Sequence, residues 1–305
     1  MRAIEIENLS YFYYTDFLRR KIPALKQVNL SIEEGECFGY LGPNGAGKTT
    51  TIKCILGLIR PRVGHIRIFG RSSLDTAARE SVGYLPEQPY FYDYLTVAET
   101  LEMYGTLTGL HGAALRSAVS QSLERLDMLS RSSSRMRSLS KGLTQRVAMA
   151  QAIIASPRLL ILDEPFSGLD PIGRQQFRQL LFELRKDGVT ILTSSHILSD
   201  VEYLCDRASI ATKGEIRSII DLKKRNEVLK GHYELVLRTE GQVPPDLLQL
   251  ATRTRPQGPT LVLEFESEEQ GRAALALALN RHCTIERWEF CHSSLEDMFM
   301  SVVQH

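Results

Sequence analysis

Cysteine is scarce in this sequence and follows no recognisable pattern. The 305 residues include five cysteines, an odd number, and no two of them have CxxC spacing. Disulfide-stapled domains and zinc sites usually show paired or regularly spaced cysteines. We therefore expect neither, and a reducing cytosol is the simplest location for the chain.

Long hydrophobic runs are missing as well. The longest apolar stretch, AALALALN near residue 275, is well short of the roughly 18 residues that a membrane-spanning helix needs. The N-terminal MRAIEIENLS contains no apolar segment of the kind found in signal peptides. We expect a soluble chain.

An excess of one charge is also absent. Lys and Arg total 37, Asp and Glu total 36, and the formal net charge is +1. A bulk attraction to nucleic acid or to an anionic membrane is not indicated, and we expect no nucleic-acid partner. The length suits one large domain with an appendage, or two domains.

Strand and helix signals alternate along the first two thirds of the chain. Strand-like segments occupy residues 4–14, 24–33, 36–42, 64–70, 81–88, 157–166 and 189–196. Helical spacing occurs at 51–59, where Pro61 stops it, at 177–188, and through a helical insert at about 96–137. Strands that alternate with helices in this way predict a doubly wound, mostly parallel α/β sheet.

The pattern changes near residue 221, where the charged stretch DLKKRNEVLKG begins. Beyond it, β, α, β, α, β and α patterns follow at residues 232–238, 245–254, 260–267, 268–282, 283–290 and 293–303. We therefore predict two domains, residues 1–220 and 221–305, of which the second is a small α+β domain.

A glycine-rich loop follows one predicted strand and opens a predicted helix. Residues 42–49, GPNGAGKT, fit the pattern GxxxxGK[ST]. Glycines allow successive backbone N–H groups to point at phosphate oxygens, and the helix N-terminus adds its partial positive charge. Lys48 would reach the β and γ phosphates, and the hydroxyl of Thr49 would bind Mg²⁺.

Polar residues follow three other strand signals. Asp163 ends LLILD at the sheet edge where ligands bind, so it could hold Mg²⁺ directly or through water. Glu164 could act as a general base on a water that attacks the γ phosphate. His196 ends VTILTSSH and could hydrogen-bond the γ phosphate, and Gln88 in YLPEQPYF could contact Mg²⁺ or water. Taken singly, an acidic strand end or a lone histidine is often only structural.

Together these motifs resemble those of the ATP-binding cassette (ABC) ATPases that drive membrane transporters. GPNGAGKT is similar to the phosphate loop of that family, LPEQ to its glutamine loop, LSKGLTQR to its signature, LLILDEP to its acidic strand, SGLD to its D-loop and SSH to its switch histidine. Their order and spacing match over residues 4 to about 220. The resemblance implies a P-loop NTPase fold with an antiparallel β subdomain, ATP hydrolysis, and ATP and Mg²⁺ as ligands.

The resemblance also implies roles for individual residues. Lys48, Glu164 and His196 would be catalytic, and Thr49, Gln88 and Asp163 would hold the metal. The implied ATP-binding residues are Tyr13, which would stack on adenine, Gly42, Asn44, Gly45, Gly47, Lys48, Thr49, Thr50, Ser140 and Gly142.

The signature, residues 139–146, contains no acid, histidine or thiol. In this family two cassettes pack head to tail, and each nucleotide lies between the phosphate loop of one copy and the signature of the other. The resemblance therefore implies a second copy of the chain as a partner, with Asp170 at the dimer contact. Ser140 would also cap the helix that follows. Lys141 and Leu143 depart from the usual signature.

The signature and the terminal SSLEDMFMSVV resemble those of cassettes that serve exporter permeases for drugs, polysaccharides or similar cargo. A separate transmembrane permease is the second expected partner, which implies a cytoplasmic location, peripheral on the inner face of the cell membrane. Aromatic residues could anchor the permease, or could simply pack within the helical insert. They are Tyr90, Phe91, Tyr92 and Tyr94.

Three other functions stay open: an importer cassette, a soluble non-transport ABC ATPase, and a module that binds ATP only as a regulatory ligand. Soluble translation factors of the family usually carry two cassettes in one chain, and its repair ATPases carry long coiled coils. The sequence shows neither a repeat nor sustained heptads. Intact Lys48, Asp163 and Glu164 favour hydrolysis over regulatory binding.

Overall fold

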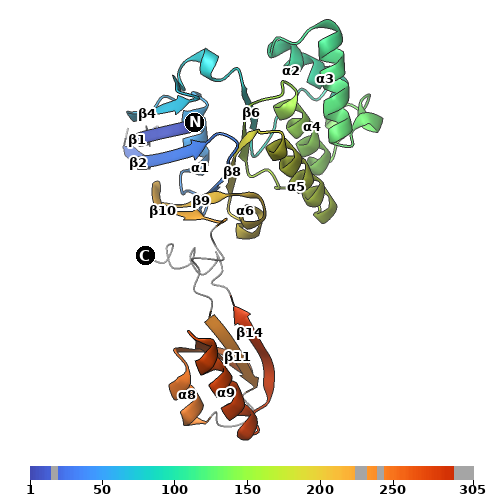
Figure 1. The fold of residues 1–305 in the computed structure, drawn as a ribbon. Helices are drawn as coiled ribbons and strands as arrows, with labels where there is room; N and C mark the ends of the chain where they lie inside the picture. The colour runs from blue at the N-terminus through green and yellow to red at the C-terminus, as the bar shows by residue number, and fades with distance from the viewer. Residues whose placement is uncertain (15–19, 224–231, 239–243, 292–305) are drawn as a thin grey trace. The chain divides into compact units, whose positions relative to one another are not determined.

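The computed structural model describes residues 1–14, 20–223, 232–238 and 244–291 (Figure 1). The chain divides into two compact units, Met1–Leu222 and Lys223–His305, and each is described by itself. The helix predicted at residues 293–303 lies outside the described residues, as does most of the charged stretch 221–231. In the part of the chain that the structure describes, no helix combines the length and the apolar character that crossing a membrane requires.

The first unit contains an antiparallel sheet with the strand order β2-β1-β4-β5. Its strands are β1 (Arg2–Tyr14), β2 (Lys21–Glu33), β4 (Val63–Ile68) and β5 (Arg71–Ser72). Ile4, Ile6 and Leu9 of β1 are buried, whereas Glu7 between them is exposed, as expected of a strand with one face on the core. The antiparallel subdomain that the family resemblance implies is confirmed.

The second sheet of this unit has the order β10-β9-β3-β8-β7-β6. Its strands are β3 (Cys37–Leu41), β6 (Val82–Leu85), β7 (Leu159–Asp163), β8 (Thr190–Ser195), β9 (Arg207–Thr212) and β10 (Glu215–Asp221). All neighbours pair in parallel except β9 and β10. Strands β3, β7 and β8 are buried along their whole length, which explains the apolar sequences of β3 and β7, whereas β8 also buries four Thr and Ser residues. The predicted mostly parallel sheet is confirmed.

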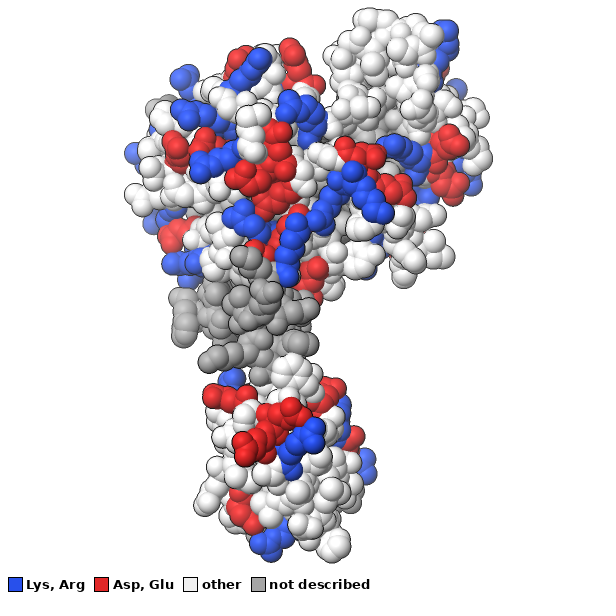
Figure 2. Space-filling view, viewed as in Figure 1, with Lys and Arg blue, Asp and Glu red and all other residues white. Residues whose placement is uncertain are grey.

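Six helices of the first unit connect or cover these strands (Figure 1). They are α1 (Lys48–Ile55), α2 (Val97–Leu107), α3 (Gly112–Arg125), α4 (Lys141–Ile153), α5 (Pro171–Lys186) and α6 (Leu198–Leu204). Helices α2 and α3 lie within the predicted helical insert and contact each other and α4. Figure 2 shows Lys and Arg interspersed with Asp and Glu on the visible face of this unit, so that face carries no extended surface of one sign.

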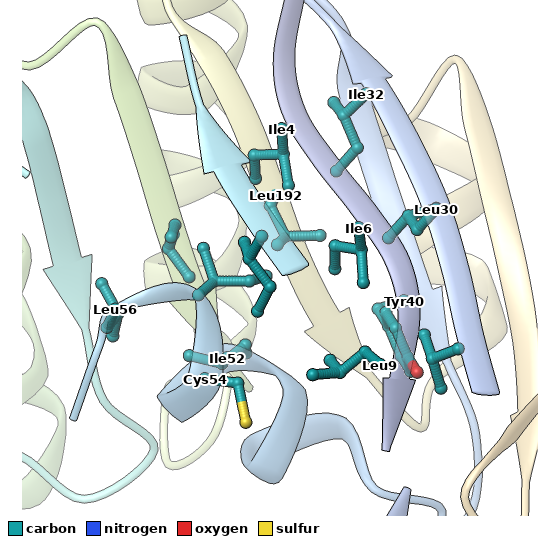
Figure 3. Packing of buried hydrophobic residues seen from close by; sticks show 14 of the residues in the cluster. Ile4, Ile6, Leu9, Leu30, Ile32, Tyr40, Ile52, Cys54, Leu56 and Leu192 are labelled. Carbon is teal, nitrogen blue, oxygen red and sulfur yellow. The ribbon is translucent and has the colours of Figure 1, made fainter. Parts of the chain in front are cut away.

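Helix α1 contributes to the core between the two sheets (Figure 3). Ile52 and Cys54 of α1 are buried in one cluster with Ile4 and Ile6 of β1 and Leu192 of β8. Burying an aliphatic side chain of this size contributes roughly 1.5–3 kcal/mol. The core therefore fixes the helix that follows the glycine-rich loop, and with it the position of the loop.

Helix α1 ends earlier than the sequence pattern predicts. Its last residue is Ile55, whereas the apolar spacing suggested a helix up to Ile59. Gly57 has a φ of +65°, and a Cβ there would lie 2.8 Å from the carbonyl oxygen of Ser73. The left-handed glycine, rather than Pro61, terminates the helix.

The second unit is a four-stranded antiparallel sheet with the order β12-β13-β11-β14. Its elements are β11 (His232–Arg238), α8 (Pro245–Leu250), β12 (Arg253–Gln257), β13 (Thr260–Phe265), α9 (Glu268–Asn280) and β14 (Ile285–Cys291). Leu235, Leu247, Phe265 and Ala274 belong to its separate core. The helix predicted at 245–254 is therefore wrong beyond Leu250, because its last residues begin the exposed edge strand β12.

Candidate active site

The candidate site lies where three neighbouring parallel strands end. Strand β8 pairs with β3 on one side and with β7 on the other. The glycine-rich loop follows β3, His196 follows β8, and Asp163 and Glu164 end and follow β7. Because parallel strands point their carboxyl ends to one edge, segments far apart in sequence meet there.

A cavity of about 400 Å³ lies at this edge of the sheet. Most of the predicted loop residues line it, together with Glu164 and His196. The lining residues are Pro43, Asn44, Gly45, Ala46, Gly47, Lys48, Thr49, Thr50, Glu87, Glu164, Ser167 and His196. Gln88 is exposed and does not line this cavity, whereas its neighbour Glu87 does. Sequence reasoning missed Glu87 and Ser167, although each lies within three residues of a residue that it selected.

The backbone of the glycine-rich loop is shaped for close approach to a ligand. Gly45 and Gly47 have φ values of +81° and +96°, which disfavour any other residue. A Cβ on Gly47 would lie 2.9 Å from the carbonyl oxygen of Ala24. No side chain caps the N-terminus of α1, so its first N–H groups are available to an anion.

Lys48 is nearly buried beside the loop, with 7% of its side chain exposed. Its ammonium group donates to the carbonyl oxygen of Gly42 over 2.7 Å. The same nitrogen lies 3.3 Å from Oε1 of Glu164. Lys48 therefore holds a positive charge between the loop and the acidic strand end, where a phosphate group would fit.

Glu164 joins Lys48 to His196. The second carboxylate oxygen of Glu164, Oε2, lies 2.9 Å from Nδ1 of His196. The backbone of Glu164 has a φ of +50°, and its N–H donates to both Oγ and the carbonyl oxygen of Ser194. A carboxylate in this position can accept a proton, and the imidazole can hold its orientation.

Asp163 is 1% exposed and only one of its carboxylate oxygens is satisfied. Ser194 donates from Oγ to Oδ1, and Oδ2 has no hydrogen-bond partner among the described residues. Burial, and then the carboxylates of Asp163 and Glu87, raise the pKa of Tyr84 to about 12. Asp163 does not itself line the cavity, whereas Thr49 does. The unpaired carboxylate oxygen of Asp163 and the hydroxyl of Thr49 are hard oxygen ligands of the kind that suits Mg²⁺.

Tyr13 lies beside the start of α1. Its hydroxyl group is 3.3 Å from Oγ1 of Thr50, and its ring is 41% exposed. The ring makes an edge contact with Tyr11, with centroids 5.0 Å apart. An exposed aromatic face next to the cavity could stack on a nucleotide base, and the predicted role of Tyr13 stays a prediction.

The signature residues lie at the start of α4 and are not among the residues that line the cavity. Ser140 caps α4, where its Oγ accepts from the N–H of Leu143 over 3.4 Å, so its predicted capping role is confirmed. Asp170 likewise caps α5 by accepting from the N–H of Gly173 over 2.8 Å, and its side chain is exposed. Neither Ser140 nor Gly142 lines the cavity.

The aromatic residues after Gln88 differ in their exposure. Phe91 is only 7% exposed and its ring lies 5.9 Å from that of Tyr104 in α2. Tyr90, Tyr92 and Tyr94 are exposed. Phe91 therefore packs within the helical insert, and only the three tyrosines are available to a partner.

Comparisons with known proteins agree with this geometry. A family model described as ABC transporter matches residues 25–167. The uncharacterized ABC transporter ATP-binding protein YxlF of Bacillus subtilis (strain 168) is 34% identical over 305 residues, which are 98% of this chain and 99% of that protein. The bacitracin transport ATP-binding protein BcrA of Bacillus licheniformis is 39% identical over 209 residues, 67% of this chain and 67% of BcrA.

A solved structure extends the similarity to the fold. The dimeric post-hydrolysis state of the ATP-binding cassette MJ0796, bound to ADP and Pi, matches with a TM-score of 0.67 and 26% identity. The match covers 72% of this chain and 98% of that one. The chain thus belongs to the ABC transporter family, as a nucleotide-binding subunit that hydrolyses ATP with Mg²⁺ as the accompanying ion.

Proposed function

We propose that two copies of this chain close head to tail around ATP, so that the signature of each copy completes the site of the other. One observation carries the proposal: the cavity is lined by the loop, Glu164, Ser167 and His196, and leaves out Ser140 and Gly142. The N–H donors at the N-terminus of α4 therefore do not serve the cavity of their own chain. The dimeric state of the MJ0796 cassette supports the same arrangement.

Within each proposed site, different residues bind the phosphates, hold the metal ion and accept the proton. The loop N–H groups and Lys48 would bind the phosphates, and Asp163 and Thr49 would hold Mg²⁺, which would supply positive charge to offset that of the phosphates. A γ phosphate next to Lys48 would compete with Glu164 for its ammonium group, 3.3 Å away. The released carboxylate of Glu164 then accepts a proton from the attacking water, while His196 orients it.

The roles of Gln88 and Tyr13 are part of the same proposal. Gln88 follows β6, whose carboxyl end lies at the same sheet edge next to β7. Its amide would reach Mg²⁺ or water from there by a small movement of its loop. Tyr13 would stack on adenine, since its hydroxyl already lies beside Thr50 of α1.

The proposed transporter also includes a separate membrane permease. Residues 1–220 would be the ATPase domain, and residues 221–305 would add dimer contacts or regulation. The exposed Tyr90, Tyr92 and Tyr94 lie between the Gln88 loop and α2, where a permease could sense the site. The subunit would then lie on the cytoplasmic face of the membrane.

Export is the proposed direction of transport. The signature and the terminal segment resemble those of exporter cassettes, and the relative BcrA is named for bacitracin transport. An operon partner with about six hydrophobic spans would agree with this direction. A gene for an extracytoplasmic binding protein in that operon would favour import instead.

Mixing two inactive variants tests the shared site. Lys48→Ala removes the phosphate contact, and Ser140→Asp keeps the helix cap but places a negative charge against the partner's phosphate. Each variant alone should hydrolyse little ATP. An equal mixture should recover about a quarter of the wild-type rate, because half of randomly paired dimers are mixed and each contains one intact site.

Ser140→Asn is the matched control for this mixing experiment. It has nearly the size of aspartate and also caps helices, but it adds no charge. It should retain most of the ATPase rate on its own. A mixture of the first two variants that is no more active than their average would contradict a site shared between copies.

A further inference from the structure

The side chain of Lys141 lies against the SGLD turn of its own chain. Lys141 is the first residue of α4, and Gly168 belongs to the turn between β7 and α5. A Cβ built on Gly168 would lie 2.7 Å from Cε, 2.8 Å from Cδ and 3.0 Å from Cγ of Lys141. Three consecutive carbons of the lysine stem therefore occupy the space that a side chain at Gly168 would need.

Two further contacts hold the same segments together. A Cβ on Gly142 would lie 3.4 Å from the carbonyl oxygen of Gly168, so the two backbones approach closely. Gln145, one turn further along α4, is buried and donates from Nε2 to the carbonyl oxygen of Pro165 over 3.1 Å. The start of the signature helix thus lies on the segment that follows Glu164.

The contact between Lys141 and Gly168 connects the cavity of this chain to its signature segment. Ser167 lines the cavity of this chain, and its N–H donates to the carbonyl oxygen of Glu164 over 3.1 Å. Gly168 follows directly and contacts Lys141. Under the proposed function, Ser140 and Gly142 serve the nucleotide of the second copy. Lys141 therefore lies between the site of its own chain and the segment that completes the partner's site.

The packing of the stem also explains why a lysine is tolerated at this position. A cation in the first turn of a helix is opposed by the helix dipole. Among the described residues, the Lys141 ammonium group forms no ion pair that would offset this cost. The long alkyl stem does offer apolar contact over Gly168, as lysine stems commonly do.

We propose that Lys141 is a positioning residue whose alkyl stem holds the signature turn against Gly168. Nucleotide bound in the site of one copy thereby fixes the position of the signature that completes the site of the other copy. This inference rests on the proposed two-copy site. It assigns the effect to the stem and not to the charge. Lys141→Met, which keeps a long unbranched stem, should therefore behave like the wild type, whereas Lys141→Ala should not.

The test compares the two substitutions in a Glu164→Gln background, where ATP is bound but slowly hydrolysed. The MgATP concentration that produces half of the dimer is measured by light scattering, and binding of ATP to the monomer by calorimetry at low protein concentration. Lys141→Ala should need several-fold more MgATP for dimerisation, with unchanged monomer affinity. Lys141→Met should match the Glu164→Gln parent in both measurements.

Each other result has a distinct meaning. If Lys141→Met is as defective as Lys141→Ala, the ammonium group acts and the proposal about the stem is wrong. If both variants dimerise like the parent, Lys141 has no positioning role. If the Glu164→Gln parent itself never dimerises, the proposed function fails, and the inference that rests on it fails with it. Circular dichroism confirms that each variant is folded.

Discussion

Ser194 shows how a single residue prepares the site without contacting a phosphate. It is buried in β8 opposite Asp163 and donates its hydroxyl to Oδ1, while Oδ2 has no partner in the described part of the chain. The same hydroxyl accepts from the N–H of Glu164 over 3.2 Å. Residues that orient metal ligands in this way commonly set metal affinity.

Ser194→Ala tests this role. Loss of the hydroxyl should let the Asp163 carboxylate rotate, and the Mg²⁺ concentration for half-maximal ATPase activity should rise about 10–100-fold. The measurement is a Mg²⁺ titration of hydrolysis at saturating ATP.

Thr193→Val is the matched control for Ser194→Ala. Thr193 is the buried neighbour in β8, and its Oγ1 has no hydrogen-bond partner among the described residues. Replacing it with an isosteric apolar residue should leave the Mg²⁺ dependence unchanged. If Ser194→Ala and Thr193→Val titrate alike, Ser194 does not position the metal ligand.

At this scale the sequence predicted residues by type and motif but not by contact. Lys48, Glu164 and His196 were selected from their motifs, and the structure places Lys48 and His196 each within hydrogen-bonding distance of Glu164. Ser194 was missed because its importance comes from the register of β7 on β8, which only the folded sheet defines. Glu87 was missed because nothing distinguishes one exposed glutamate from its neighbours in a single sequence.

At the scale of elements, a strand or helix could be predicted where its sequence carries a clear hydrophobic pattern, and not where that pattern is missing. Strands β3 and β7 are buried on both faces, so their sequences are continuous apolar runs. Strand β12 is exposed throughout and contains Pro256, and it exists because it pairs with β13. An edge strand of this kind has no local pattern that separates it from a loop.

Helix α1 connects the hydrophobic core to the candidate active site. Its inner side chains are fixed in the core, and its first residue, Lys48, enters the site directly after Gly47. The left-handed φ of +96° and the close carbonyl of Ala24 leave no room for a side chain at Gly47. The start of the helix can therefore be disturbed at one position without removing its core contacts.

Gly47→Ala should separate nucleotide binding from folding. The added methyl group must displace the loop, so we expect ATP affinity to fall at least about tenfold, or ~1.4 kcal/mol, measured by calorimetry.

Gly188→Ala serves as the control for Gly47→Ala. Gly188 follows α5 with a φ of +85° and has no atom within 4 Å of a built Cβ. It should cost about 1 kcal/mol in unfolding free energy from strain alone and leave ATP affinity unchanged. Equal affinities for the two variants would show that the shape of the loop at Gly47 does not matter for binding.

On the scale of the whole molecule, the chain has two units with separate cores. The first unit carries every residue that lines the cavity and also the signature. Ser140 and Gly142 of the signature nevertheless do not line the cavity of their own copy. Under the proposed function, a second copy of the chain supplies the signature that completes each site.

The mass of a hydrolysis-deficient variant tests this dependence most directly. Glu164→Gln should retain the contacts of the loop and Lys48 with ATP but lose the proton acceptor, so bound ATP should hold two copies together. Light scattering should show the 34.4 kDa chain without nucleotide and twice that mass with saturating MgATP. The double variant Lys48→Ala/Glu164→Gln should stay at the monomer mass. A Glu164→Gln protein that binds MgATP yet remains at the mass of one chain would contradict the account.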